Sequence, residues 1–279
     1  MTAPNVSNPT RSAATANQVR LPRTAALGPG RGEQPRLLID APAGAAEIYL
    51  HGATVTSWVP RGGAEVIFTS RQAVFDGATA IRGGIPLCLP EFGAGINGDA
   101  VPKHGWARIA PWRLRTVTST DDGGVRALLS VSRDHLTALC EIQIGETLRL
   151  GLSLRNDGTE PRTVEAAAHT YLSVHDVTAS LVSGLAGASY SDNLARSPQE
   201  LRQVQDGDVR ITGPVDRIYD SAEPVTVTDP GHRRAIHIDK RNAPSTIMWN
   251  PWSTYSAPLP DMADDEFPTM VCVESGAVR

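Results

Sequence analysis

The chain has 279 residues, of which 41% are hydrophobic, so it can bury a full core as one large domain or two ordinary ones. Its formal net charge of −4 and sequence pI of about 6.0 argue against a nucleic-acid-binding protein, because such proteins normally present a basic face. No apolar run approaches the roughly 18 residues of a membrane-spanning helix. We therefore expect no binding to nucleic acid or to membrane.

Residues 1–34 differ in composition from the rest of the chain. They are rich in Ala, Thr, Asn, Pro and Gly and contain almost no large apolar side chains. Such a segment buries too little surface to offset the entropy lost on ordering. We predict a flexible tail over residues 1–34 that is dispensable for activity, with a docked strand as the alternative for its last few residues. The start also lacks the apolar middle of a signal peptide, which favours a cytoplasmic location.

From Leu37 onward the pattern is one of short strands separated by turns. Apolar and polar residues alternate over residues 47–60, 125–134, 147–157, 161–174, 225–231 and 234–240. This alternation, bounded by Gly, Asp, Asn or Pro, is typical of antiparallel sheets with one buried face. Residues 197–207 are one of the few helical candidates, and the signal is weak. The pattern predicts a single all-β sandwich or barrel domain over residues 35–279.

A glycine-rich segment, "GAGING" at residues 93–98, matches the pattern G-x-G-x-x-G. The dinucleotide fingerprint requires a strand before these glycines and a helix after them, so that phosphate meets the helix N-terminus. Here Pro86 and Pro90 precede the segment and Pro102 follows it. The context therefore predicts a turn and no nucleotide site.

Neither the histidines nor the cysteines fall into a recognised zinc spacing, and no C-x-x-C occurs. We expect no metal or organic cofactor, although spacing does not test a site assembled from distant residues. Cys88, Cys140 and Cys272 stand in apolar surroundings, which favours buried thiols in a reducing compartment. Because the chain also lacks G-x-S-x-G, it does not indicate a serine or cysteine nucleophile.

Polar residues inside apolar runs are the strongest candidates for chemistry. His169 stands in "EAAAHTYLSV" and Glu274 in "MVCVESGAV". Each has an ordinary interpretation, since a histidine can be a satisfied core residue and a glutamate can mark the end of a strand. However, a carboxylate is costly to bury unless it is paired or functional. Together with the basic segment "VPKHGWARI" at residues 101–109, the two residues form a set of general acid, general base and anion clamp.

Several motifs in sequence order resemble the glucose-6-phosphate 1-epimerases, the hexose-6-phosphate mutarotases of the aldose 1-epimerase (galactose mutarotase-like) superfamily. They are "HGATVTSWVP", "VFDGATAIRGGIPLCLPEFG", "PKHGWAR", "AAAHTYLSV", "VDRIYD", "WNPW" and "MADDEFPTMVCVESGAV". The resemblance extends from about Ile48 to Val278. It implies an antiparallel β-supersandwich and the interconversion of the α and β anomers of a hexose 6-phosphate, foremost glucose 6-phosphate, without a cofactor. It also makes a monomer the expected state.

The resemblance further implies roles for seven residues. His169 corresponds to the general acid and Glu274 to the general base, and the substrate-binding positions are Arg82, Lys103, His104, Arg108 and Asp216. Of these, Arg82 and Arg108 are expected to hold or flank the 6-phosphate, because a guanidinium presents a planar fork that suits phosphate oxygens. Lys103 stands where many relatives have glutamine. It either adds a charge to the anion site or pairs with Glu91 or Asp99.

Acid–base chemistry fits these side chains, because ring opening requires the C1 hydroxyl to lose a proton while the ring oxygen gains one. A glutamate with a reference pKa of about 4.3 is ionised at neutral pH, and a histidine titrates at about 6.5. We expect a neighbouring carboxylate to raise the pKa of His169 and keep it protonated. Two alternatives are an aldose 1-epimerase acting on unphosphorylated sugar and a non-catalytic carbohydrate-binding sandwich.

Overall fold

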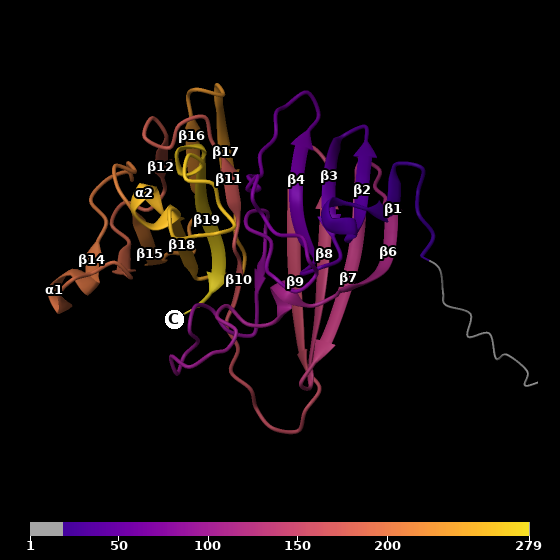
Figure 1. Ribbon diagram of the computed structural model, residues 1–279, viewed down its shortest axis with the longest axis horizontal. Coiled ribbons are helices and arrows are strands. Elements are labelled where there is room, and N and C mark those ends of the chain that lie inside the picture. The colour runs from indigo at the N-terminus through magenta and orange to yellow at the C-terminus, as the bar shows by residue number, and fades with distance from the viewer. Residues whose placement is uncertain (1–18, 279) are drawn as a thin grey trace, which may run out of the picture.

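The computed structural model describes residues 19–278, which form two β-rich halves that lie side by side (Figure 1). The first half contains two antiparallel four-stranded sheets, each with its strands in sequence order. One sheet consists of β1 (Ala25–Pro29), β2 (Pro35–Ala41), β3 (Gly44–Tyr49) and β4 (Thr54–Pro60). The other consists of β6 (Arg113–Ser119), β7 (Val125–Arg133), β8 (Leu136–Ile144) and β9 (Leu148–Asn156).

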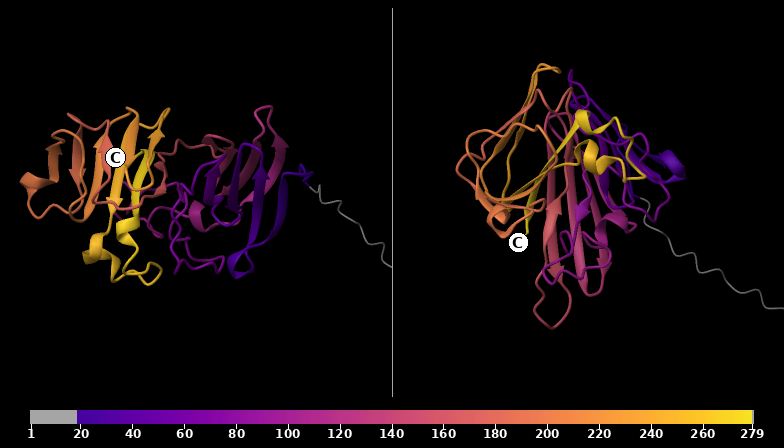
Figure 2. Two further views of the ribbon diagram at one scale, coloured as in Figure 1. Left: turned by 90° about the horizontal axis from the view of Figure 1, so that it is seen from above. Right: turned by 60° about the vertical axis from the view of Figure 1, so that its left-hand side comes forward.

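The two sheets of the first half face each other (Figure 2) and enclose one hydrophobic core. Leu37 and Ile39 on β2 pack in the same cluster as Leu129 on β7 and Ile142 on β8, and all four are fully buried. They occupy alternate positions along their strands, so their neighbours in sequence point away from the core. Burial of such a side chain contributes about 1.5–3 kcal/mol, which accounts for the alternation seen in the sequence.

The second half is built on an eight-stranded antiparallel sheet in the order β14-β13-β15-β18-β19-β10-β5, with β11 also paired to β19. Its strands are β5 (Leu87–Cys88), β10 (Ala166–Ala168), β11 (Tyr171–Ser173), β13 (Ser189–Asp192), β14 (Arg202–Val204), β15 (Val215–Asp220), β18 (Ser245–Asn250) and β19 (Met270–Ala277). A three-stranded sheet of β12 (Leu181–Ser183), β16 (Val225–Asp229) and β17 (Arg234–Ile238) packs against it through a second core. The all-β, antiparallel prediction is therefore confirmed.

Helical structure is scarce among the described residues. The elements are α1 (Pro198–Leu201), α2 (Trp252–Ser256) and the 3-10 turns η1 (Arg31–Glu33), η2 (Ala107–Ile109) and η3 (Phe267–Thr269). The helical candidate at residues 197–207 yields only the single turn α1, because the residues that follow pair with β13 as β14. No helix in residues 19–278 is long and apolar enough to cross a membrane.

The ordered fold starts earlier than the boundary expected after residue 34. Strand β1 pairs with β2 along its whole length, and Val19 and Leu21 pack against the first core. Arg31 donates from its backbone N–H to Tyr49 Oη and lies over the Phe75 ring. Composition missed these contacts because an edge strand obtains its stability from backbone pairing with β2, and few of its own side chains are large. Residues 1–18 of the predicted tail lie outside the described residues.

Candidate active site

The two predicted catalytic residues meet in the middle of the large sheet. His169 lies in the short break between β10 and β11, and both strands pair with β19, which carries Glu274. The distance from His169 Nε2 to Glu274 Oε1 is 3.3 Å. His169 is 8% exposed and Glu274 only 1%. Among the described residues, His169 Nδ1 and Glu274 Oε2 have no hydrogen-bond partner, so both buried groups keep capacity for a ligand.

Tyr171 connects this pair to Arg82. The Tyr171 ring stacks on the His169 ring with centroids 4.8 Å apart and planes inclined by 13°. Arg82 Nη1 donates to Tyr171 Oη at 3.2 Å, and Arg82 Nε donates to Asp261 at 3.1 Å. Two of the five guanidinium N–H donors are thereby used, which leaves three for a ligand.

The backbone beside Arg82 explains the glycine pair that follows it. Gly83 has φ of 108°, and a Cβ at this position would lie 2.5 Å from Thr69 Cα. A larger residue would therefore clash with the neighbouring backbone as well as adopt a disfavoured conformation. The loop can pass this close to residues 68–69 only with glycine, and this close passage sets the position of Arg82.

His104, from the basic loop, lies beside His169 in the site. Its ring centroid lies 5.8 Å from that of His169. His104 Nδ1 accepts a hydrogen bond from the Gly93 N–H at 3.3 Å and lies 3.3 Å from Cys88 Sγ. Burial, together with Arg108, Arg82 and Lys103, lowers the pKa of His104 to about 3. The neutral ring therefore carries its proton on Nε2, where it can donate to a ligand. The residues 93–98 form the predicted turn, and the structure shows that this turn orients His104.

The basic loop ends in η2, which carries Arg108. Its Nη2 donates to the Lys103 backbone carbonyl at 3.0 Å, so the guanidinium is held near the start of its own loop. The Lys103 side chain is exposed, and within residues 19–278 it forms no ion pair with Glu91 or Asp99. The pairing alternative for Lys103 is therefore absent from this structure.

Asp216 reaches the site from the neighbouring strands. It lies on β15 opposite Trp249 of β18, and Trp249 lies opposite Cys272 of β19. Residues paired across antiparallel strands project from the same face of the sheet, so Asp216, Trp249 and Cys272 share the face of Glu274, two residues further along β19. Asn193 Nδ2 donates to Asp216 Oδ1 at 2.8 Å, and burial raises the pKa of Asp216.

The protonation of the central pair differs from the expectation. Burial lowers the pKa of His169 well below its usual value, and His104, Arg108 and Arg82 lower it further. Burial also raises the pKa of Glu274, with Asp216 adding to the shift and Arg108 opposing it. The expected upward shift of the His169 pKa is thus a wrong prediction for the ligand-free protein. Removal of both groups from water outweighs the attraction between them.

Two residues in this network were missed by sequence reasoning. Tyr171 belongs to the segment "AAAHTYLSV", and an aromatic residue two positions after His169 was the available signal. Asp261 is 179 residues from Arg82 in sequence, so no local pattern could identify their pairing.

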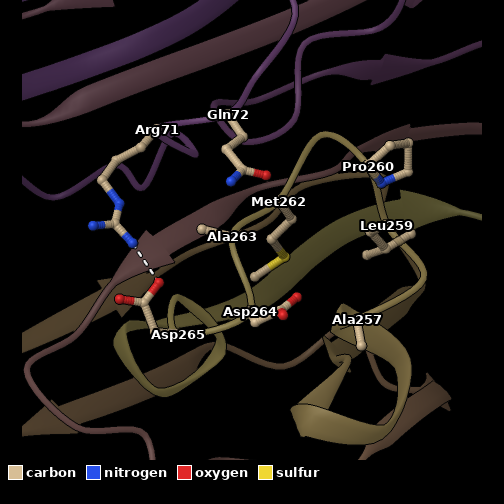
Figure 3. A pocket seen from close by; sticks show the side chains of 9 residues that line it. All are labelled: Arg71, Gln72, Ala257, Leu259, Pro260, Met262, Ala263, Asp264 and Asp265. Atoms are coloured by element: carbon tan, nitrogen blue, oxygen red, sulfur yellow. Dashed lines mark hydrogen bonds and ion pairs between the residues drawn. The ribbon is translucent and has the colours of Figure 1, made fainter.

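The segment that carries Asp261 borders a surface pocket of about 650 Å³ (Figure 3). Its lining residues are Arg71, Gln72, Ala257, Leu259, Pro260, Met262, Ala263, Asp264 and Asp265. None of the seven predicted site residues is among them. Glu266 attaches this segment to the loop at residues 70–71, because it accepts hydrogen bonds from Ser70 Oγ at 2.7 Å and from the Arg71 N–H at 2.8 Å. This attachment holds Asp261 against Arg82.

Known proteins are similar to this chain in both sequence and fold. A family model described as aldose 1-epimerase matches residues 35–279. A "Putative glucose-6-phosphate 1-epimerase" of Cenchrus ciliaris is 32% identical over 253 residues, covering 84% of this chain and 75% of that protein. A protein of Escherichia coli (strain K12) with the same name is 30% identical over 249 residues, covering 86% and 82%.

The solved structures point to the same family as the sequence relatives. A "putative mutarotase" from Salmonella typhimurium has a TM-score of 0.84 at 27% identity and covers 94% of this chain and 88% of its own. A galactose mutarotase-like protein from Lactobacillus casei, at 16% identity and a TM-score of 0.62 over 86% of this chain and 87% of its own, shares the fold. Since the family model matches almost all of the described residues, the chain belongs to the aldose 1-epimerase family and is an isomerase with a galactose mutarotase-like fold.

Proposed function

We propose that the chain interconverts the α and β anomers of a hexose 6-phosphate, with glucose 6-phosphate as the first candidate substrate. The observation that carries the proposal is the buried His169–Glu274 pair, whose nearest nitrogen and oxygen lie 3.3 Å apart. Tyr171 connects Arg82 to this pair, because its ring stacks on His169 and its hydroxyl accepts a hydrogen bond from Arg82. The names of the relatives in Cenchrus ciliaris and Escherichia coli support the same substrate.

In this reaction Glu274 accepts the proton of the C1 hydroxyl while His169 donates a proton to the ring oxygen. The O1–H electrons form the C1=O1 bond, the C1–O5 bond breaks, and its electrons remain on O5, which takes the proton from His169. The resulting aldehyde rotates about C1–C2, and the ring closes on the other face with both proton transfers reversed. Because every proton passes between side chain and sugar, the steps need only these two groups.

The ligand-free pair requires one internal proton transfer to reach the reactive form. The directions of the two pKa shifts favour neutral His169 and protonated Glu274, so one transferable proton is shared between the two side chains. Moving this proton from Glu274 to His169 produces the ionised base and the charged acid without any exchange with solvent. Such coupled groups titrate as a pair.

The 6-phosphate is assigned to Arg82 and Arg108, whose charges both act on His169. Arg82 retains three free N–H donors, and Asp261 and Tyr171 fix its plane. Bidentate guanidinium–phosphate contacts are among the strongest hydrogen bonds in proteins. Lys103, at the exposed rim, adds long-range attraction for the dianion. Asp216 and the Nε2–H of His104 orient the sugar hydroxyls as acceptor and donor.

Two alternatives make different demands on these residues. An epimerase for unphosphorylated sugar has no use for Arg82 and Arg108, and a non-catalytic sugar-binding sandwich has no use for a buried acid–base pair. The arrangement therefore favours a phosphate-directed enzyme. Within the same proposal, the protein acts as a cytoplasmic monomer that binds neither nucleic acid nor membrane.

Anomer exchange measured by NMR magnetisation transfer tests the proposal. Glucose 6-phosphate, glucose and galactose are compared for the wild type, for Arg82→Ala and for the control Arg126→Ala, which removes an exposed arginine on β7. Loss of charge-assisted hydrogen bonds at about 1.5–3 kcal/mol each is expected to lower kcat/KM for glucose 6-phosphate by roughly 10- to 150-fold in Arg82→Ala. Equal or faster wild-type exchange on galactose would reject the phosphate-directed function.

A further inference from the structure

The face of β19 that carries Glu274 also carries a thiol that the proposed reaction does not use. Cys272 lies two residues before Glu274 and is fully buried. A ring nitrogen of His169, Cys272 Sγ and a carboxylate oxygen of Glu274 all lie within 4.8 Å of one another. Three different metal-ligating side chains therefore converge on one small volume.

The distances between these three ligand atoms are close to the ligand–ligand distances of a tetrahedral zinc site. With metal–ligand distances of about 2.0–2.3 Å, the ligand atoms of such a site lie roughly 3.3–3.8 Å apart. The His169–Glu274 distance of 3.3 Å already meets this requirement. No two of the three ligand atoms are more than 4.8 Å apart, so each separation exceeds the tetrahedral range by at most about 1 Å, which small side-chain rotations can remove.

A second observation points to a ligand at the same place. Glu274 Oε2 and His169 Nδ1 are buried without a hydrogen-bond partner among the described residues, although buried polar atoms are normally paired. Both belong to residues that are more than nine-tenths buried. The pair therefore retains capacity to coordinate in addition to its mutual contact.

We infer that His169, Cys272 and Glu274 form an inhibitory binding site for a borderline-soft divalent cation, foremost Zn²⁺. A thiolate with an imidazole favours Zn²⁺ over Mg²⁺ or Ca²⁺, which prefer oxygen ligands. When the metal binds, the S–H proton of Cys272 leaves to solvent as the metal–sulfur bond forms. Three protein ligands leave one tetrahedral position open for water.

Coordination occupies the two groups assigned to proton transfer, so the metal and productive sugar binding exclude each other. This blockade rests on the proposed function, whereas the metal site itself does not. Zn²⁺ is therefore expected to inhibit anomer exchange, and Mg²⁺ at the same concentration is not.

Co²⁺, a spectroscopic substitute for Zn²⁺, tests the site without any activity measurement. Thiolate-to-Co²⁺ charge-transfer absorption is expected for the wild type and for Cys140→Ala, which removes a buried thiol on β8. It is expected to vanish in Cys272→Ala and Cys272→Ser. The neighbouring rings of His175 and His232 can also bind Co²⁺, but that pair includes no cysteine and gives no such band. Thermal unfolding identifies any Cys272 variant that does not fold, and Cys272→Val is then measured in place of that variant.

Inhibition provides the second readout. Loss of one ligand is expected to raise the Zn²⁺ concentration for half-inhibition at least about tenfold in the Cys272 variants, with Cys140→Ala unchanged. The inference would be overturned if the wild type lacked the charge-transfer band or if the Cys272 variants kept it. Equal sensitivity of the wild type and the Cys272 variants to Zn²⁺ would also overturn it. If the band follows Cys272 but no substrate is turned over, the proposed function fails and the metal site stands.

Discussion

The phosphate of the substrate is expected to change the protonation of His169. In the ligand-free protein, burial lowers the pKa of His169 most, followed by His104, Arg108 and Arg82. A bound phosphate dianion offsets the two guanidinium charges, so the pKa of His169 rises in the complex. Glucose has the same ring and no phosphate. Comparing glucose 6-phosphate with glucose therefore isolates this electrostatic effect.

The magnitude follows from the short connection between Arg82 and His169. Arg82 Nη1 lies 3.2 Å from Tyr171 Oη, and the Tyr171 ring lies 4.8 Å from the His169 ring, so one side chain separates the guanidinium from the imidazole. Two charges about 8 Å apart repel by about 2 kcal/mol at an effective dielectric constant of about 20. Offsetting one guanidinium therefore raises the pKa of His169, because it removes a repulsion of this order from the charged imidazolium.

The expected effect on rate has a definite sign. The general acid must carry its proton, so kcat falls as pH rises through the pKa of His169 in the substrate complex. With glucose this fall occurs at lower pH than with glucose 6-phosphate. A repulsion of about 2 kcal/mol makes the ratio of the two kcat values increase by up to about 30-fold between the plateau and alkaline pH.

The assay is the exchange rate of saturating sugar by NMR, corrected for uncatalysed exchange, from acidic to alkaline pH. The range extends far enough below neutral pH to include the plateau for both sugars, because the pKa of His169 lies well below its usual value in the ligand-free protein. Saturating sugar limits the influence of the second ionisation of the phosphate monoester, at about pH 6, on binding. Arg82→Ala supplies a second arm, because removing the cation is expected to raise kcat on glucose at neutral pH while lowering kcat/KM on glucose 6-phosphate. Coincident alkaline limbs for the two sugars would refute the electrostatic link between phosphate and acid.

Three further predictions concern single features of the structure. Glu274→Gln is expected to lower kcat about 10²- to 10⁴-fold with little change in the affinity for glucose 6-phosphate, because only the proton acceptor is lost; equilibrium binding and exchange rates measure the two effects. Asp261→Asn weakens a charge-assisted hydrogen bond to Arg82 and is expected to raise KM for glucose 6-phosphate about tenfold, with kcat on glucose unchanged. Deletion of residues 1–31 removes β1 and the Arg31 contacts, and it is expected to lower the Tm by at least about 5 °C.

Each of these predictions has an outcome that would contradict it, and two of them have a matched control. Turnover retained in Glu274→Gln would exclude a proton-transfer role for this residue. Asp265→Asn alters an exposed carboxylate that pairs with Arg71 in the same segment, and an equal rise in KM there would trace the effect to the segment and not to Arg82. A chain that starts at residue 19 keeps β1, and equal Tm values for the two deletions would mean that β1 contributes nothing to stability.

Local patterns predicted the strands well because each buried strand repeats the same alternation. Val125, Ala127 and Leu129 on β7 are fully buried while Arg126 between them is exposed, as period two requires. The start of the fold was misplaced because β1 is held by pairing with β2 and by contacts such as Arg31 with Tyr49. Those contacts depend on the partner strand, which composition does not describe.

For the site, the sequence indicated which residues are unusual but not how they are arranged. His169 and Glu274 were recognisable as polar groups in apolar runs. Their contact depends on the register of β10, β11 and β19, which joins segments about a hundred residues apart. The closeness of Cys272 to His169 depends on the same register. The protonation of His169 and Glu274 was the least predictable property, because it depends on burial and on charged side chains carried by two separate loops.

Burial links phosphate recognition by the two arginines to proton transfer by the His169–Glu274 pair. In water, charges at such distances interact weakly, whereas in a desolvated site each guanidinium changes the protonation of the pair. Arg108 lowers the pKa values of both His169 and Glu274, so offsetting its charge moves both in the same direction. Arg82 lowers the pKa of His169, so its neutralisation by phosphate stabilises the charged form of His169, which is the form that opens the ring.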